Sequence, residues 1–284
     1  MDPANSNQRK KIVIVGGVAG GMSAAARARR LCEGSEIVVL ERGGFVSFAN
    51  CGLPYYLGGE ITRRESLLVQ TPQSLKDRFN LDVRTHQEVL AIDAESRFVT
   101  VKDRINDRLY RESYDDLLLA VGAAPVVPDL PGIKLPGIFT LRSLEDADQI
   151  KLWIENEGVR NAVIAGAGFI GLEMAEQLAR QKIQVTVVEG LDQVLAPVDP
   201  EMAALVHEEL RRHGIKLVLS SFIKKFSAAA EVECNGAVPR SCWLWAGDHP
   251  AIAADLVILG LGIRPELTLA RQCGLAESVP RTPS

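Results

Sequence analysis

The sequence predicts an α/β protein made of two similar units, each with a parallel sheet and an antiparallel meander insertion. Three observations support this prediction. The chain contains an internal repeat, its strand-like runs are continuous in Val, Ile and Leu, and strands and helices alternate along each copy. Continuous apolar runs are typical of strands buried on both faces. Strand–helix–strand order is typical of right-handed parallel crossovers.

The two copies of the repeat share the same succession of features. Each has a β-branched run, a Gly-rich turn, an Ala-rich helix, a second apolar run and then a glutamate. The first copy runs from KIVIVGGVAGGMSAAARARRL (11–31) to SEIVVLE (35–41), and the second from NAVIAGAGFIGLEMAEQLARQ (161–181) to QVTVVE (184–189). The copies also close alike, with YDDLLLAVGAAP and AADLVILGLGIRP. A repeat of this kind indicates two domains of one plan.

The segments between the strand–helix units differ in how clearly their sequences predict strands. LDVRTHQEVLAID (81–93), RFVTVKD (97–103) and RLYRESY (108–114) alternate and predict an antiparallel meander. The matching stretch of the second copy, 227–251, alternates poorly and predicts no definite strand. Residues 126–147 are rich in Pro and Gly, as connections between domains often are. The predicted parts are therefore a first domain, a connection, a second domain and a short return to the first, at 1–125, 126–147, 148–265 and 266–284.

Composition and charge limit the class of protein. The 284 residues are 47% hydrophobic and 24% charged, which is typical of a soluble globular chain, and no apolar run reaches the ~18 residues of a membrane helix. A net charge of −4 argues against nucleic acid or an anionic membrane as the main partner. The five cysteines are scattered, odd in number and without a CxxC pair, so we expect no disulfide framework and no metal site. A reducing cytoplasm is the expected compartment.

The first Gly-rich turn carries features of a dinucleotide site. Gly16 ends the first strand and allows a tight turn, and Gly21 lets the following helix pack closely on the sheet. The helix N-terminus between them offers N–H groups to a pyrophosphate. Val18 stands where the GxGxxG pattern has its middle glycine. Glu41, 20 residues after Gly21, ends the second strand and can bind ribose hydroxyls.

The second turn fits the same pattern without a departure. Gly166, Gly168 and Gly171 fit GxGxxG, and Glu189 follows 18 residues later. An acidic residue at this place repels a 2′-phosphate and is followed by Gly190 rather than Arg, so NADH is favoured over NADPH. For one motif alone the alternative is a packing turn. Two copies of the motif, each followed by a glutamate at the expected spacing, argue for two bound dinucleotides. One is commonly a tightly bound flavin and the other an exchangeable nicotinamide dinucleotide.

Cys51 lies in SFANCGLPYY (47–56), soon after the first dinucleotide unit. The alternative role for a single cysteine is that of a small buried hydrophobe. Three features argue against it here. Cys51 follows Glu41 by ten residues, its segment is bounded by Gly and Pro rather than apolar, and it stands at the predicted start of a helix or turn, which favours a thiolate. The other cysteines have no comparable pattern.

With these motifs the sequence resembles the single-cysteine class of the pyridine nucleotide–disulfide oxidoreductases. GGVAGG, SFANCGLPYY and FTLRSLEDAD carry the resemblance, which covers about residues 10–270. Among its members the sequence is most similar to coenzyme A disulfide reductases and NADH-dependent persulfide reductases, and less so to NADH oxidases and peroxidases. The implied fold has two Rossmann-like domains of the glutathione reductase type. Two-cysteine relatives have CxxxxC, whereas Tyr56 stands at the second position here.

The resemblance also implies the residues of each site. Those implied for FAD are Gly16, Val18, Ala19, Gly20, Gly21, Glu41, Arg42, Ala120, Gly122 and Arg142. Those implied for NADH or NADPH are Gly166, Gly168, Phe169, Ile170, Gly171, Glu189 and Gly262. Those implied for a coenzyme A-type substrate are Ser23, Arg30, Ser47 and Asn50.

The implied activity is FAD-dependent NAD(P)H:disulfide or persulfide oxidoreduction, with Cys51 as the single redox-active residue. Cys51 attacks the substrate sulfur and is regenerated through the flavin. The alternative is an NADH oxidase or peroxidase in which Cys51 cycles through sulfenic acid. The resemblance implies a homodimer formed by a further C-terminal domain, which we expect this chain to lack. An inactive truncated fragment, for which a homodimer is doubtful, is therefore the third interpretation.

Overall fold

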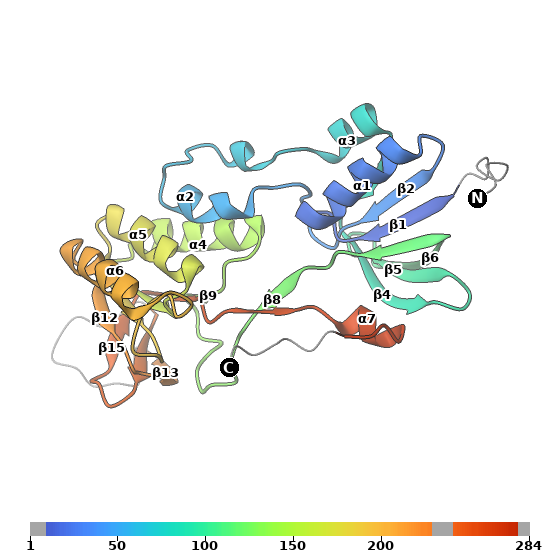
Figure 1. Ribbon diagram of the computed structural model, residues 1–284. Helices are drawn as coiled ribbons and strands as arrows, with labels where there is room; N and C mark the ends of the chain where they lie inside the picture. The colour runs from blue at the N-terminus through green and yellow to red at the C-terminus, as the bar shows by residue number, and fades with distance from the viewer. Residues whose placement is uncertain (1–9, 229–240, 278–284) are drawn as a thin grey trace. The chain divides into compact units, whose positions relative to one another are not determined.

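The computed structural model describes residues 10–228 and 241–277, and it forms two compact units (Figure 1). Unit 1 comprises residues 1–49, 68–123 and 265–284, and unit 2 comprises residues 50–67 and 124–264. The chain therefore passes between the units at four places. Residues 50–67, which carry Cys51, pack with unit 2, although they fall inside the predicted first domain, 1–125. The reason is that a short helix in this segment packs against two helices of unit 2.

Unit 1 is built on a four-stranded parallel sheet with the order β3-β2-β1-β7. Its elements are β1 (Lys11–Val15), α1 (Ala19–Leu31), β2 (Glu36–Leu40), α3 (Pro72–Phe79), β3 (Asp82–Arg84) and β7 (Asp116–Leu119). Ile14 and Val39 pack beneath the helices, whereas Val13 and Val38 pack on the opposite side of the sheet. Both faces are thus buried, which explains why the strands read as continuous apolar runs rather than alternating ones.

The meander of unit 1 covers the sheet face opposite the helices (Figure 1). It consists of β4 (Gln87–Asp93), β5 (Phe98–Asp103) and β6 (Arg108–Ser113), all antiparallel. The predicted insertion is confirmed, except that its first residues form the parallel strand β3 instead. The helix α7 (Thr268–Gln272) belongs to the same unit, and its Leu269 is buried in the core between meander and sheet.

Unit 2 repeats the plan with a five-stranded parallel sheet in the order β12-β11-β10-β16-β9. Its strands are β9 (Ile138–Phe139), β10 (Asn161–Ala165), β11 (Gln184–Val188), β12 (Lys216–Val218) and β16 (Leu256–Leu259). Its helices are α4 (Leu144–Glu157), α5 (Phe169–Arg180) and α6 (Pro200–Arg212). The order β12-β11-β10-β16 matches β3-β2-β1-β7 of unit 1, so the two copies of the sequence repeat have the same topology.

Unit 2 also has the predicted antiparallel insertion, formed by β13 (Ile223–Ala228), β14 (Cys242–Ala246) and β15 (Ile252–Ala254). Of its strands, β14 lies within 227–251, where the sequence predicted no definite strand. In β14 the residues Cys242, Leu244 and Ala246 are buried, and the two tryptophans between them are half-buried. Both sets are apolar, so the sequence does not show the alternation that the structure has. The remainder of this stretch, 229–240, including Cys234, lies outside the described residues.

Short elements complete the chain. They are η2 (Asn50–Gly52), α2 (Leu53–Leu57), η3 (Arg64–Leu67), β8 (Ala123–Pro125) and β17 (Ile263–Pro265). β8 pairs with β17, and the last two passages of the chain between the units, at 123–124 and 264–265, lie in these two strands.

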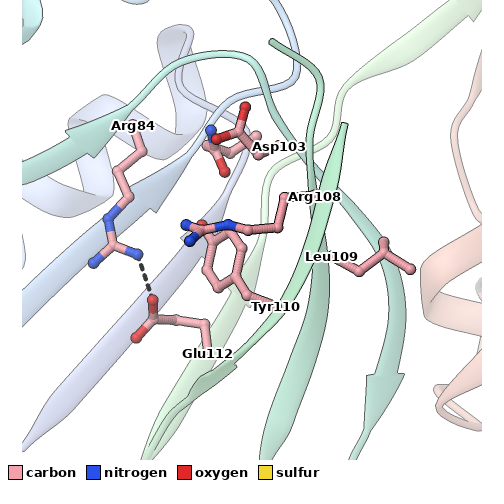
Figure 2. Close-up of a pocket in the computed structure, with 7 residues that line it drawn as sticks. Arg84, Asp103, Arg108, Leu109, Tyr110 and Glu112 are labelled. Carbon is pink, nitrogen blue, oxygen red and sulfur yellow. Dashed lines mark hydrogen bonds and ion pairs between the residues drawn. The ribbon is translucent and has the colours of Figure 1, made fainter. Parts of the chain in front are cut away.

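A hollow of about 530 Å³ on unit 1 is lined by residues of β3, β4, β5 and β6, among them the paired Arg84 and Glu112 (Figure 2). Glu112 on β6 is paired with Arg84 on β3 and, at 2.5 Å, with Lys11 on β1. Lys11 also pairs with Glu36 at 3.0 Å, and Arg84 with Asp82. Because cations of the parallel sheet neutralise the carboxylate of the meander, this network ties the two layers together.

Asp103, beside this hollow, predicts an acid-dependent loss of stability. Its carboxylate accepts hydrogen bonds from the Asn106 side chain at 2.8 Å and from the N–H groups of Asn106 and Ile105. The hydrogen bond from the Asn106 side chain, followed by those from the backbone N–H groups, lowers the pKa of Asp103 to about 2. An Asp side chain in an unfolded chain has a pKa of about 3.9. The stability that these hydrogen bonds give the folded protein is present above pH ~4 and is lost as the pH falls from about 4 to 2.

The expected result is that Asp103→Asn lowers the melting temperature most above pH ~5, and that the gap to wild type narrows between pH ~4 and ~2. Thermal unfolding followed by circular dichroism across this pH range measures the gap. Asp129→Asn, at an exposed position of the chain, is the matched control. A gap that stays constant with pH would contradict the assigned role of Asp103.

Candidate active site

The first Gly-rich loop is a tight turn from β1 into α1. Gly16 has a φ of +104°, and a Cβ there would lie 2.2 Å from the backbone oxygen of Ala120, just after β7. A Cβ on Gly21 would lie 1.8 Å from the backbone oxygen of Gly16. Both contacts are with backbone, which cannot move aside cheaply. Val18, the departure from the GxGxxG pattern, has a φ of −98°, which any residue adopts.

Glu41 is held against this loop by two backbone hydrogen bonds. Its Oε2 accepts from the N–H of Gly17 at 2.7 Å, and its Oε1 accepts from the N–H of Gly43 at 2.8 Å. The carboxylate is therefore fixed at the carboxyl end of β2, beside the turn. Each oxygen retains a second lone pair, so the carboxylate can also accept hydrogen bonds from ribose hydroxyls.

The second loop repeats this geometry in unit 2. Gly166 has a φ of +100°, and its Cβ would lie 2.4 Å from the backbone oxygen of Gly260, just after β16. The Cβ of residue 171 would lie 2.1 Å from the oxygen of Gly166. Glu189 accepts from the N–H of Ala167 at 2.7 Å and from that of Leu191 at 3.0 Å. The two loops thus share one geometry, although only the second has the middle glycine of GxGxxG.

Both loops lead into helix N-termini that the chain itself leaves uncapped. α1 and α5 have no side-chain cap and no acidic residue in the first turn. Their first N–H groups therefore remain available to a ligand, and the helix dipole favours an anion there. Around Gly168 nothing lies within 4 Å of an added Cβ, so the backbone faces open space where a pyrophosphate would approach. The residues present fit a dinucleotide at each loop.

Cys51 is an exposed free thiol in η2, directly before α2. The prediction that it lies at the start of a helix or turn is confirmed, and the alternative of a buried small hydrophobe is wrong. The helix that follows is buried through Leu53, Pro54, Tyr56 and Leu57. The thiol is thus exposed on a segment whose apolar side chains are buried.

Apolar and cation–π contacts fix α2 on unit 2. α2 packs against α4 and α5. Tyr56, at the position of the second cysteine in the two-cysteine pattern, is 7% exposed, and the ammonium of Lys151 on α4 lies 4.1 Å from its ring centre. On the same segment, the pKa of Tyr55 is raised. The largest cause is the negative charge of Glu173 on α5, followed by burial and by the charge of Glu176.

Polar contacts fix the rest of the Cys51 segment, 50–67. Arg64 makes a bidentate pair with Asp148 on α4, with N–O distances of 2.6 to 2.9 Å. Glu60 accepts from Gln177 at 2.9 Å and pairs with Arg180 at 2.7 Å, both on α5. Sequence reasoning missed these contacts, since they join residues 84 to 120 positions apart and no motif marks them.

The comparisons with known proteins identify the family. The family model for pyridine nucleotide-disulphide oxidoreductases matches residues 10–278. The chain belongs to this family. The resemblance found from the sequence motifs is thereby confirmed, as is the predicted α/β fold with two dinucleotide-binding domains.

Three relatives show which members of this oxidoreductase family are similar. A coenzyme A disulfide reductase of Staphylococcus haemolyticus is 37% identical over 75% of this chain and 48% of its own length. An NADH oxidase of Methanocaldococcus jannaschii is 32% identical over 93% of this chain and 57% of its own length. The crystal structure of reduced Bacillus anthracis CoADR-RHD is 46% identical, with a TM-score of 0.89, over 96% of this chain and 47% of that one. The chain spans about half the length of the relatives it matches.

The residues predicted for this family's sites divide between the two units. Unit 1 holds the predicted flavin residues from Gly16 to Arg42, with Ala120 and Gly122, and the substrate candidates Ser23, Arg30 and Ser47. Ser47 lies at the first loop, because its N–H donates to the oxygen of Gly17 at 2.9 Å. Unit 2 holds Asn50, Cys51 and Arg142, together with all the residues predicted for the nicotinamide dinucleotide.

The other described cysteines differ from Cys51 in their surroundings. Cys242 is fully buried, and burial raises the pKa of its thiol. Cys32 is exposed, and a hydrogen bond with Ser35 lowers its pKa. All four cysteines that the structure describes are free thiols.

The described residues contain neither a cluster of metal ligands nor a membrane-spanning helix. Within residues 10–228 and 241–277, no group of three or more His, Cys, Asp or Glu side chains is placed to hold a metal ion. None of the helices in those ranges combines the length and the apolar character needed to cross a membrane.

Proposed function

We propose that the protein is an FAD-dependent NAD(P)H oxidoreductase that reduces a disulfide or persulfide of a coenzyme A-type thiol through Cys51. The observation that carries the proposal is the exposed thiol of Cys51 on a fixed segment, in a chain with two dinucleotide loops of equal geometry. The coenzyme A disulfide reductase among the relatives supports the substrate class.

The first loop would hold FAD, and the second would hold NADH. At the first, the uncapped N-terminus of α1 would bind the pyrophosphate and Glu41 the ribose hydroxyls. At the second, Glu189 would bind the adenosine ribose, and its charge disfavours the 2′-phosphate of NADPH. Bound flavin supplies two-electron transfer between nicotinamide and a disulfide.

The chemistry of the chain's own residues centres on the Cys51 sulfur. Its thiolate attacks one sulfur of R–S–S–R′, a Cys51–S–S–R bond forms, and R′–S⁻ leaves and takes a proton from water. The overall balance is NADH + H⁺ + RSSR′ → NAD⁺ + RSH + R′SH. Tyr56 stands where a resolving cysteine would be, so no internal disulfide competes with the mixed disulfide at this spacing.

A coenzyme A-type substrate offers phosphates that unit 1 could recognise. Ser23 and Arg30 are both exposed and lie seven residues apart on α1, which places them on one helix face. We include them, with Ser47 and Asn50, in the proposed substrate site. We also propose a reducing cytoplasm as the compartment, in line with the free thiols, and a homodimer as the state of the intact protein.

The test is an anaerobic assay with NADH and coenzyme A disulfide. The expected result is release of two thiols for each NADH oxidised, by a protein whose visible spectrum shows bound flavin. NADH consumption that needs oxygen and releases no thiol would instead favour the NADH oxidase activity named for one relative. A protein that binds no flavin and oxidises no NADH would contradict both activities.

A further inference from the structure

An exposed aromatic side chain lies beside the acidic residue of the second loop. Phe222 stands between β12 and β13, and its side chain is 71% exposed. Its ring lies against Gly190, the residue that follows Glu189. A Cβ added to Gly190 would lie 2.5 Å from Cε1 of Phe222 and 2.7 Å from its Cδ1. The ring therefore occupies the space that any side chain at position 190 would need.

Backbone hydrogen bonds hold Phe222 at this place. The N–H of Ser221 donates to the oxygen of Glu189 at 2.9 Å, and the N–H of Ser220 donates to the oxygen of Leu191 at 2.7 Å. On the other side, the N–H of Gly247 donates to the oxygen of Phe222 at 3.0 Å. The ring is thus presented from a fixed backbone, beside Glu189, which directly follows β11.

The surroundings of the ring suit the adenosine half of a dinucleotide. Leu191, next to Gly190, is 48% exposed, so an apolar surface adjoins the carboxylate that would bind the ribose. An adenine ring stacks well on an aromatic face. By contrast, a 2′-phosphate is accommodated by an Arg close to the acidic residue, and the ring of Phe222 has to move aside before such a side chain fits at position 190.

We propose that Phe222 is a specificity-determining residue of the second dinucleotide site. Its ring supplies an apolar face for adenine and lies over Gly190, where a side chain that binds a 2′-phosphate would start, so that the site selects NADH over NADPH. This inference rests on the proposed assignment of the second loop to the nicotinamide dinucleotide, and it adds a residue that no motif marks.

The test uses calorimetric titration of the full protein with ADP-ribose and with 2′-phospho-ADP-ribose, neither of which can reduce flavin. Phe222→Ala is expected to weaken ADP-ribose binding about tenfold, and Phe222→Tyr to keep it within about twofold. Leu205→Ala, which removes another exposed apolar side chain from unit 2, is the matched control and should leave binding unchanged. Flavin content should be equal in all variants.

A second pair of variants tests the exclusion at position 190. Gly190→Arg combined with Phe222→Ala is expected to bind 2′-phospho-ADP-ribose at least about tenfold more tightly than Phe222→Ala alone, whereas Gly190→Arg alone should gain less. Equal affinities of wild type, Phe222→Ala and Phe222→Tyr for ADP-ribose would overturn the inference while the proposed function stands. Failure of the wild type to bind ADP-ribose would overturn both.

Discussion

Replacing Cys51 with serine is expected to reduce the rate of coenzyme A disulfide reduction by about 10³-fold or more, because the hydroxyl cannot form the mixed disulfide that the reaction requires. The side chain is exposed, so the substitution leaves the core of the segment intact. The measurement is release of free thiol from coenzyme A disulfide under anaerobic conditions with NADH. NADH-dependent reduction of an artificial electron acceptor should persist, because it needs the dinucleotide sites and not the thiol.

Cys32 provides the matched control for this prediction. It too is exposed, and its hydrogen bond with Ser35 lowers the pKa of the thiol, so it is the described cysteine most able to rival Cys51 as a nucleophile. Cys32→Ser is expected to keep the wild-type rate. Loss of activity in Cys32→Ser with retention in Cys51→Ser would move the reaction to the other thiol and refute the proposed mechanism.

The fold could be predicted because its signals are local. The glycines, the continuous apolar runs and the spaced glutamates each reflect a contact within one strand–helix–strand unit, as the bonds from Gly17 and Ala167 to the two glutamates show. An antiparallel insertion was predicted for unit 2 as well, but the positions of its strands could not be predicted. In β14 the inward residues, such as Leu244, and the outward ones, such as Trp243, are all apolar, so the pattern that normally marks a half-buried strand is missing.

The candidate site, like the fold, has one part that the sequence predicted and one part that it did not. Cys51 was found because its flanking Gly, Leu and Pro set it apart from a core residue. The groups that hold its segment were missed, because Arg64 and Asp148, or Tyr56 and Lys151, become neighbours only when the chain folds. For the same reason the packing of residues 50–67 with unit 2 could not be read from their position in the sequence between two elements of unit 1.

The paired glycines at the helix starts allow the two dinucleotide sites to be removed one at a time. In Gly21→Ala the new methyl would lie 1.8 Å from the backbone oxygen of Gly16, and in Gly171→Ala it would lie 2.1 Å from that of Gly166. Since only backbone can yield, each turn must open, at a cost of about 1–3 kcal/mol. The N–H groups proposed to bind the pyrophosphate move with the turn, so we expect ligand affinity to fall by about tenfold to a hundredfold.

The two variants should differ in which ligand they lose. Gly21→Ala is expected to lose flavin, measured by its visible absorbance, and to keep ADP-ribose binding, measured by calorimetry. Gly171→Ala is expected to do the reverse, because each contact lies within one unit. Gly34→Ala, whose added methyl would have no atom within 4 Å, is the control for the effect of a glycine substitution alone. Loss of both ligands in either variant, or of neither, would show that the two loops do not act as separate sites.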